Sequence, residues 1–514
     1  MSHRLDRRRF LQTAGLLLVA PAISLSGCAR PRFTSDPFTL GVASGAPLPD
    51  GIVLWTRLAP DPLAGGGLDP QPIPVHWEVA ADDAFRDIVR RGVANADPRY
   101  AHSVHVEVNA LRPDRWYWYR FMVGDAVSPT GRTRTAPAPD ALGRWRFAFA
   151  SCQQYEQGYY SAHRHLAQED LDLVVFLGDY VYESSWGRNH VRKHEAPEPR
   201  TLEQYRNRHA HYKTDPDLQR SHAQFPWIVT WDDHEVSNDY ANDRSQDLDP
   251  DFLSRRTAAY QAYYEHMPLR TDARPQRTQL RLYQAYDFGR LARFHVLDGR
   301  QYRSYQPCPK AGRGGGTIVT RENCPERLES QQTMLGRQQE QWLADSLEKS
   351  NARWNIIAQQ TLMAQLTRNV DPAPQWWTDS WDGYPAARQR LLTQLAARKP
   401  ANPVVISGDA HTNFVCDLKT DFDDAQAPVV ATEFCGTSIS SQGPALKETD
   451  AWRTNNPHIK FARGDRRGYV TVALDGQRAR VRLRVIKNEK LESSPIATQA
   501  AFVVEDGRAG AESD

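Results

Sequence analysis

The chain has almost no net charge, few cysteines and no long apolar run. Its 514 residues carry 64 basic and 62 acidic side chains, a formal net charge of +2, so net charge gives no indication of a polyanion-binding surface. The apolar run from Leu16 to Ala20 is too short to cross a bilayer as a helix. Because the chain is too long for one ordinary hydrophobic core, we expect two or three domains.

Residues 1–27 have the pattern of an export signal rather than of a folded segment. Residues Asp6 to Leu11 match the twin-arginine export pattern, and Leu25 to Cys28 match a bacterial lipobox in which Cys28 would be lipidated. We therefore expect export by the twin-arginine machinery to the periplasm or cell envelope, with membrane contact only through a lipid anchor at Cys28. Ordinary cleavage nearby, which would leave a soluble secreted protein, is the alternative.

Five cysteines remain after Cys28, and an odd number in an oxidising compartment suggests that one thiol has separate work. Cys308 and Cys324 flank a glycine-rich loop and are expected to close it with a disulfide. Cys416 and Cys435 could form a second bridge. Cys152 is then left unpaired.

Residues 37–137 are expected to form an N-terminal all-β domain. Apolar and polar residues alternate from Val75 to Val79 and from Val104 to Val108, as in half-buried strands. Leu111 to Arg120 resembles the tyrosine corner of immunoglobulin-like and fibronectin-like sandwiches. A proline-rich boundary follows at 135–139, and we assign 138–505 to a second domain and 506–514 to a polar tail.

The second domain is predicted to be a layered α/β structure. Leu171 to Leu177 is an almost continuous apolar run, typical of a strand buried on both faces of a parallel sheet, and Gly178 and Asp179 follow at its carboxyl end. Ligands of open α/β sheets bind at this edge. Further strand-like runs end in Cys152, in Asp233 and in Asp409, with helical spacings between them. Residues 469–474 and 479–485 are expected to form a closing hairpin.

A metal centre is the simplest interpretation of these strand ends. Clustered carboxylates repel one another unless cations compensate them. A thiolate and a tyrosinate need a strongly Lewis-acidic ion such as Fe(III), whereas the remaining carboxylates suit Ca(II). The candidate ligands are Cys152, Asp179, Tyr182, Asp233, Asp409 and His411.

The motifs in this order resemble those of calcineurin-like metallophosphoesterases. The set comprises Gly178-Asp179 with Tyr182, Asp233-His234-Glu235, and Gly408-Asp409-Ala410-His411. The chain departs from the purple acid phosphatase pattern at Cys152, Asp233 and Asp409. Those departures, together with Ser151-Cys152-Gln153 and the run from Leu297 to Arg303, resemble the motifs of the PhoD-like alkaline phosphatases. The resemblance covers essentially the whole mature chain. The resemblance implies a layered metallophosphoesterase sandwich of mixed sheets flanked by helices.

The resemblance also implies cofactors and ligands. Fe(III) would be held by Cys152, Asp179, Tyr182 and His411, and Asp179 would bridge to a Ca(II) site that includes Asp233 and Asp409. Asn238 is the candidate for a second Ca(II). Where purple acid phosphatases have a further histidine ligand, this chain offers only Gln359 or Gln360.

Three further side chains are assigned roles in catalysis. His234, beside a metal ligand, is expected to protonate the leaving alkoxide. Arg300 and Arg303 are candidates for binding the phosphate, with Arg300 also a candidate catalytic residue, because a guanidinium matches phosphate geometry. A structural ion pair is the alternative for either arginine. Trp376, Trp377 and Trp381 are expected in core packing, or alternatively in the wall of the substrate cleft.

The predicted function is an exported alkaline phosphatase that hydrolyses small phosphate monoesters and diesters by attack of a metal-activated hydroxide. A phosphodiesterase or phospholipase D-like enzyme of the same fold is one alternative. A cell-envelope binding protein with a structural metal site is another. No specific nucleic-acid partner is expected, and the sequence leaves the oligomeric state open.

Overall fold

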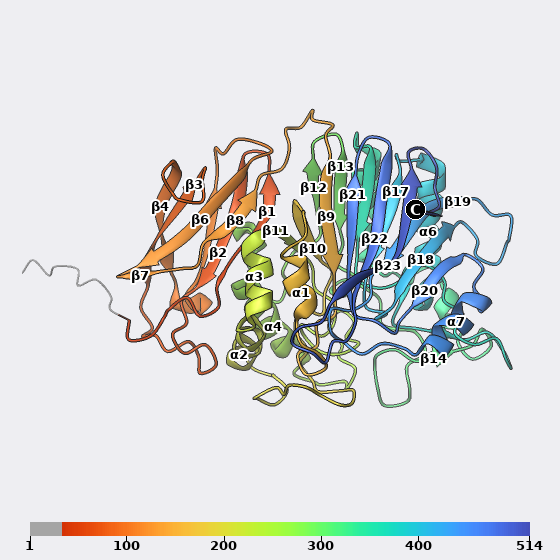
Figure 1. The fold of residues 1–514 in the computed structure, drawn as a ribbon. Helices are drawn as coiled ribbons and strands as arrows, with labels where there is room; N and C mark the ends of the chain where they lie inside the picture. Colours follow the sequence, from red (N-terminus) through yellow and green to blue (C-terminus); the bar gives the residue numbers. More distant parts are fainter. Residues whose placement is uncertain (1–32) are drawn as a thin grey trace, which may run out of the picture.

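The computed structural model describes residues 33–514, so the expected export signal and Cys28 lie outside the described residues. Two large sheets face each other and carry helices on their outer faces, with a smaller β-layer at the N-terminal end (Figure 1). The predicted layered α/β class is confirmed. Among residues 33–514, no helix is both long and apolar enough to cross a membrane.

The first large sheet has ten strands and contains the strands that lead into the predicted site. Its central strands β9, β10, β11 and β1 run parallel to one another, and antiparallel strands flank them on both sides. In spatial order the sheet comprises β24 (Glu512–Ser513), β23 (Ile496–Glu505), β22 (Arg478–Ile486), β21 (Gly468–Leu474), β9 (Trp145–Ala150), β10 (Leu173–Phe176), β11 (Pro226–Val229), β1 (Val42–Leu48), β2 (Gly51–Arg57) and β5 (Ser103–Val108).

The second large sheet has seven strands and is mixed. Strands β13, β15, β17 and β19 are parallel, and β12, β18 and β20 pair antiparallel to their neighbours. In spatial order it comprises β12 (Gln284–Phe288), β13 (Ala292–Val296), β15 (Trp354–Ala358), β17 (Pro403–Ser407), β19 (Val429–Cys435), β18 (Asn413–Lys419) and β20 (Ile459–Arg463). A two-stranded ribbon of β14 (Ile318–Val319) and β16 (Trp376–Trp377) lies apart from it.

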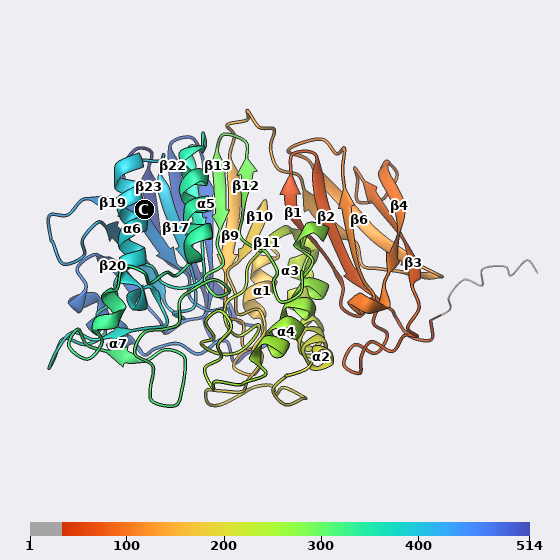
Figure 2. The ribbon, with the colours of Figure 1, turned by 180° about the vertical axis from the view of Figure 1, so that it is seen from behind.

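Helices cover the outer faces of the two sheets. On the first sheet pack α1 (Ser161–Leu166), α2 (Leu202–Lys213), α3 (Pro216–Gln224) and α4 (Phe252–His266). On the second pack α5 (Gly336–Glu348), α6 (Pro385–Arg398) and α7 (Leu446–Asn455), and Figure 2 shows α5 and α6 in front of its strands. A capping box starts α2, in which the Thr201 hydroxyl accepts from Gln204 N–H and the Gln204 side chain accepts from Thr201 N–H.

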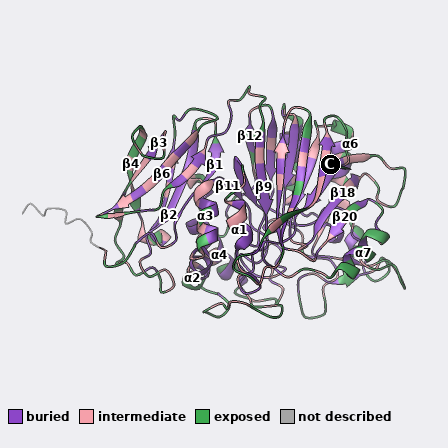
Figure 3. Ribbon diagram, in the orientation of Figure 1, coloured by how far each residue is buried: buried purple, intermediate pink, exposed green. Residues whose placement is uncertain are grey.

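The main core lies between the two sheets. Strand β10 is buried along its whole length, as its apolar sequence predicts, because sheet covers one face and helices cover the other. Phe147 of β9 meets Phe294 of β13 edge to face, with ring centroids 5.0 Å apart. Figure 3 shows the buried residues concentrated in these central strands. The stacked layers therefore hold the ends of β9, β10 and β11 in fixed positions.

The N-terminal β-layer is continuous with the first large sheet. Strands β1, β2 and β5 belong to that sheet, and a small N-terminal sheet packs on them through the cluster that contains Leu54, Val79 and Tyr119. This small sheet comprises β3 (Ile73–Ala80), β4 (Ile88–Ala96), β6 (Trp116–Val123), β7 (Ala126–Val127) and β8 (Gly131–Arg134). The Tyr117 hydroxyl accepts from Arg112 N–H at 2.9 Å, the bond expected of a tyrosine corner.

Other sequence predictions are partly confirmed. Strands β21 and β22 form the predicted hairpin, and Cys308 and Cys324 form the predicted disulfide. The second bridge considered for Cys416 and Cys435 is wrong, because within residues 33–514 neither cysteine forms a disulfide. They lie on the paired strands β18 and β19 but are not opposite each other, since Cys416 faces Glu433 and Cys435 faces Phe414. The expected polar tail after residue 505 instead returns to the sheet as β24.

Candidate metal centre

Loops at the carboxyl ends of four parallel strands carry the predicted site residues. Cys152 follows β9, Asp179 follows β10, Asp233 follows β11, and Asp409 and His411 follow β17 of the other sheet. Backbone bonds join the first two loops, with Cys152 N–H donating to the Gly178 carbonyl and Gln153 N–H to the Asp179 carbonyl, both at 3.1 Å. Residues far apart in sequence thereby meet at one edge of the two sheets.

The backbone at these positions is in the left-handed region, which non-glycine residues rarely adopt. The φ angle is 60° at Cys152, 56° at Asp179, 59° at Asp409 and 50° at His411. Such conformations cost free energy and cluster at functional sites, where the surrounding structure holds them. Gly178 allows one of these turns, because a Cβ at this residue would lie 2.6 Å from the Asp232 backbone nitrogen.

Cys152, Asp179 and His411 form one compact donor group, with one ligand atom from each lying within 4.8 Å of the others. Tyr182 borders this group, because its hydroxyl donates to Asp179 Oδ2 at 2.7 Å and lies 3.3 Å from His411 Nε2. His411 Nδ1 lies 2.6 Å from the Gln442 carbonyl oxygen, so Nδ1 carries the proton and Nε2 keeps a lone pair. A thiol, a carboxyl, a phenol and an imidazole therefore face a common point.

Asp179 also joins a second group with Asp233 and His234. His234 Nδ1 lies 2.7 Å from Glu183 Oε2, and Glu183 Oε1 accepts from Asn238 N–H at 2.8 Å. Glu183 is buried and received no role from the sequence, although it ends the same strand-and-turn segment as Asp179. It fixes the orientation of the His234 ring.

A third group consists of Asp233, Asp239 and Asp379. Asp233 Oδ2 accepts from Asp239 N–H at 2.6 Å, and Asp239 Oδ2 accepts from Gly316 N–H at 2.9 Å. Asp379 was not predicted from the sequence, because the strand before it, β16, has only two residues and gives no strand-like run that would signal the position. Asp239 lies six residues after Asp233 in the same motif and could have been found from that proximity.

The electrostatics of the site fit cations. Burial and then the Asp179 charge raise the pKa of Cys152 well above its usual range, and the same two causes raise that of Tyr182. Burial, Asp379 and Asp233 raise the pKa of Asp239 to about 8. Asp179 Oδ1 is buried and has no hydrogen-bond partner among the described residues. Buried anionic donors of this kind are stabilised by metal ions, so the donor set suits a metal centre.

Glu235, the last residue of the Asp-His-Glu motif, links two of the loops instead of facing the donors. Its carboxylate accepts from Tyr180 N–H at 2.6 Å and from Asp232 N–H at 2.8 Å. Burial raises its pKa to about 8. This side chain thereby fixes the Asp179 loop against the Asp233 loop.

The two predicted phosphate-binding arginines are engaged by carboxylates. Arg300 is fully buried, contacts Asp232 through Nε and pairs with Asp379 at 2.8 Å through Nη1, while Asp233 lies 3.6 Å from Nη2. Arg303 pairs with the same Asp379 at 3.2 Å. This geometry favours the structural ion pair that the sequence left open for both.

Other predicted ligands lie outside the compact donor groups. Both amides of Gln359 and Gln360 are used by the protein itself, with Gln360 bonding Thr230 and the Leu297 carbonyl and Gln359 accepting from the Trp381 indole at 3.1 Å. The Asn238 side chain donates to Gln246 at 3.2 Å. Asp409 is half-buried beside the groups, and burial followed by Asp232 raises the pKa of its carboxyl.

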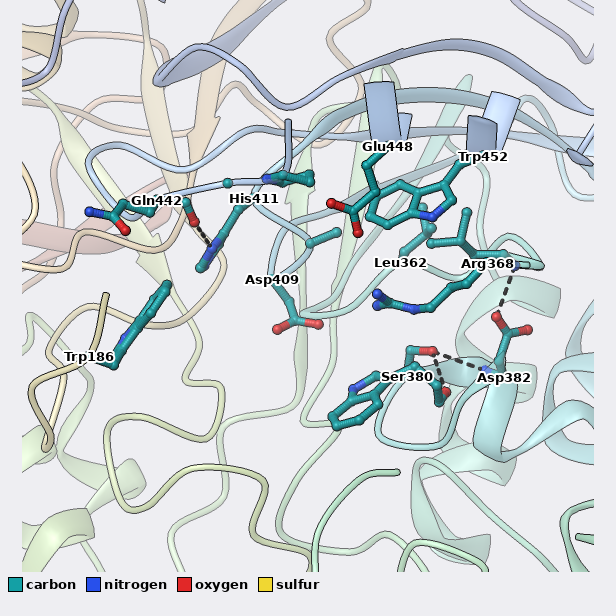
Figure 4. A pocket seen from close by; sticks show the side chains of 15 residues that line it. Trp186, Leu362, Arg368, Ser380, Asp382, Asp409, His411, Gln442, Glu448 and Trp452 are labelled. Atoms are coloured by element: carbon teal, nitrogen blue, oxygen red, sulfur yellow. Dashed lines mark hydrogen bonds between the residues drawn. The ribbon is translucent and has the colours of Figure 1, made fainter. Parts of the chain in front are cut away.

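A cavity of about 450 Å³ opens beside Asp409 and His411 (Figure 4). Its walls include Trp186 and Trp377, whereas Trp381 is buried in the core and the Trp376 ring is mostly covered. The cleft-wall alternative thus fits Trp377, and core packing fits Trp381. The volume is within the range of pockets that hold small organic ligands.

Comparisons with known proteins agree on one family. The family model described as PhoD-like phosphatase matches residues 147–483, and that of the PhoD-like phosphatase N-terminal domain matches residues 23–137. Alkaline phosphatase D of Bacillus subtilis (strain 168) is 46% identical over 528 residues, covering 98% of this chain and 88% of the relative.

Solved structures give the same result for the fold. A structure described as that of PhoD superposes with a TM-score of 0.89 at 46% identity, covering 94% of this chain and 93% of the other. A purple acid phosphatase from yellow lupin (Lupinus luteus) seeds superposes with a TM-score of 0.57 at 11% identity, covering 90% of this chain and 74% of that one. The second match shows the fold alone.

Replacing the guanidinium in Arg300→Gln tests the structural role of this side chain. The change leaves Asp232 buried without its guanidinium partner and leaves Asp379 paired with Arg303 alone, so we expect the free energy of unfolding to fall by about 3–5 kcal/mol, as for broken buried ion pairs. Urea unfolding followed by fluorescence measures it. Arg313→Gln, at an exposed pair with Asp247, is the matched control and should change the midpoint little. An unchanged midpoint with a raised KM for phosphate esters would identify Arg300 as a substrate-binding residue.

Proposed function

The chain belongs to the PhoD-like phosphatase family, and from that premise we propose that it is a metal-dependent alkaline phosphatase that hydrolyses small phosphate monoesters and diesters. It is a phosphoric ester hydrolase. The observation that carries the proposal is the meeting of Cys152, Asp179, Tyr182 and His411 at one point, beside an open cavity.

Two kinds of cation are proposed for the centre. Cys152, Asp179, Tyr182 and His411 would hold Fe(III), since a thiolate and a phenolate favour a strongly Lewis-acidic ion. Asp233 and Asp409 would hold Ca(II) with Asp179, and Asp239 and Asp379 extend the carboxylate supply for a second Ca(II) near Asn238. When bound, such cations supply Lewis acidity toward phosphoryl oxygens and lower the pKa of water.

The protein's own contribution to the reaction centres on His234. Its ring is held by Glu183 through Nδ1 and packs at a tilt of 33° against the Tyr182 ring, with centroids 4.1 Å apart, so Nε2 is the nitrogen available to a substrate. Although burial opposes it, the charges of Glu183, Asp233 and Asp179 raise the pKa of His234 well above its ordinary value. The imidazolium can therefore donate a proton to a leaving alkoxide.

The same geometry supports diester hydrolysis. A diester carries a second organic group on phosphorus, and the cavity beside Asp409 and His411 offers space for it. A phospholipase D-like activity of the same fold belongs to this class and is separated from it by substrate alone. The family assignment and the acid beside the donors disfavour the binding-protein alternative, because a structural metal site needs no open position.

The compartment is proposed from the sequence alone. The twin-arginine and lipobox patterns support export to the periplasm or cell envelope, with a lipid anchor at Cys28. An oxidising compartment agrees with the disulfide between Cys308 and Cys324.

Removing the acid should make the rate depend on the leaving group. In His234→Ala we expect kcat for an alkyl phosphate to fall by roughly 10²- to 10⁴-fold, because an alkoxide needs a proton as it leaves. The fall for 4-nitrophenyl phosphate should be far smaller, since nitrophenolate leaves unprotonated. Steady-state kinetics on both esters measure the difference, and His76→Ala, an exposed histidine on β3, is the control. Equal losses on both esters would assign His234 a positioning role instead.

Removing calcium with a chelator should abolish hydrolysis at about pH 9 and lower the thermal unfolding midpoint, and added calcium should restore both. A ligand at about 100 times its Kd stabilises the folded state by about 2.7 kcal/mol, which corresponds to a measurable shift. Asp233→Asn should lose the calcium response, whereas Asp140→Asn, at an exposed site, should keep it. A chelated protein with full activity and an unchanged midpoint would contradict an exchangeable calcium site.

A further inference from the structure

Arg368 is an unpaired arginine in the wall of the cavity beside the metal centre. Among residues 33–514, no Asp or Glu forms a salt bridge with it, and its side chain makes no hydrogen bond to the protein. Its Nε is buried without a partner. This distinguishes it from Arg300, Arg303 and Arg388, each of which pairs with an aspartate, and from Arg467, whose guanidinium donates to the carbonyls of His411 and Ser441.

The surroundings of Arg368 leave its guanidinium free for a ligand. Burial lowers its pKa, although Asp382, Glu448 and Asp409 partly offset this. Asp382 is already paired with Arg388 at 2.7 Å, and its other oxygen accepts from Leu366 N–H at 2.9 Å. Glu448 is exposed, on the first turn of α7. Burying a guanidinium without a partner costs free energy, and an anion that binds to it offsets that cost.

Aromatic rings hold the guanidinium in place. Its central carbon lies 5.2 Å from the ring centroid of Trp452 and 5.9 Å from that of Trp377. Cation–π contacts at these distances favour one orientation of the planar group. In Figure 4 the guanidinium points into the cavity toward Asp409, and the Trp186 ring lies on the far side of the same space.

The cavity connects this guanidinium to the reacting centre. Asp409 and His411 line the same 450 Å³ space as Arg368, Trp377 and Trp452. A phosphoryl group at the donors would therefore direct its organic group between the indole rings. The far end of that group would meet Arg368.

We propose that this cavity is a subsite for a second anionic group, so that the preferred substrates are phosphate esters whose organic part carries a carboxylate or a further phosphate recognised by Arg368. The proposal rests on the proposed phosphatase function. A guanidinium forks onto either oxyanion with two parallel hydrogen bonds, which gives selectivity over uncharged esters. Arg368 is a specificity-determining residue in this assignment and takes no part in bond breaking.

Paired substrates test this assignment directly. Hydrolysis of phenyl phosphate and of 3-carboxyphenyl phosphate is followed by phosphate release. The selectivity is kcat/KM for the carboxylated ester divided by kcat/KM for phenyl phosphate. We expect Arg368→Gln to lower this ratio by about 10- to 100-fold, the usual effect of losing a charge-assisted hydrogen bond. Arg368→Lys keeps the charge but not the forked pair of hydrogen bonds, so its ratio should lie between those of the wild type and Arg368→Gln. Intrinsic reactivity cancels, because each variant is measured on the same pair.

Arg453→Gln is the matched control. Arg453 follows Trp452 on α7 but is exposed and does not line the cavity, so its replacement should leave the ratio unchanged. A second arm replaces the carboxylated ester by 1,3-phenylene bisphosphate and separates phosphate from carboxylate as the preferred anion. An effect with only one of them supports the proposal for that anion.

A binding measurement keeps the proposal distinct from the proposed function. Calorimetric titration with phenylphosphonate and 3-carboxyphenylphosphonate needs no turnover. The Kd for phenylphosphonate divided by the Kd for 3-carboxyphenylphosphonate should fall in Arg368→Gln, as the kinetic ratio does. A wild-type protein that hydrolyses neither ester would contradict the phosphatase function, while the titration would still decide the subsite. Equal losses on both members of a pair, or ratios that Arg368→Gln leaves unchanged, would overturn the proposal.

Discussion

Buried negative charge at the ends of parallel strands is the constraint on which the site depends. Asp179 is shared by two of the donor groups and Asp233 by two, so carboxylates from different loops lie within a few ångströms of one another. Mutual repulsion of this kind opposes folding unless cations or ion pairs compensate it. Arg300 supplies one positive charge inside the cluster, and the proposed metal ions supply the others.

The surrounding structure serves to hold this repulsive arrangement in place. Two stacked sheets fix the strand ends, Glu235 ties the Asp179 loop to the Asp233 loop, and Glu183 orients His234. Left-handed backbone at four donor positions adds a further cost, which the packed layers sustain. The half-open cavity on one side is the part of the site left for substrate, and its aromatic walls and Arg368 give it selectivity.

Much of this arrangement was predictable from sequence because buried strands and turns have local patterns. The apolar run before Asp179 predicted β10, and the motifs predicted that Cys152, Tyr182 and His411 would meet it. Partners set by tertiary contacts were not predictable. No local pattern predicted the roles of Asp379 and Glu183. The side-chain amides of Gln359 and Gln360 hydrogen-bond to neighbouring backbone and side chains. Cys416 and Cys435 lie on paired strands but not opposite each other. Strands from both sides of the predicted domain boundary at residue 137 share one sheet, and this too arises only from long-range strand pairing.

The visible absorption spectrum of the iron-loaded protein most directly tests whether Cys152, Asp179, Tyr182 and His411 bind one ferric ion. A phenolate bound to Fe(III) gives a charge-transfer band, because the electron-rich oxygen donates to the metal. We expect the wild type to be coloured and Tyr182→Phe to lose the band while keeping its fold by circular dichroism. A protein that takes up no iron, or a spectrum that is the same in Tyr182→Phe and the wild type, would contradict this centre.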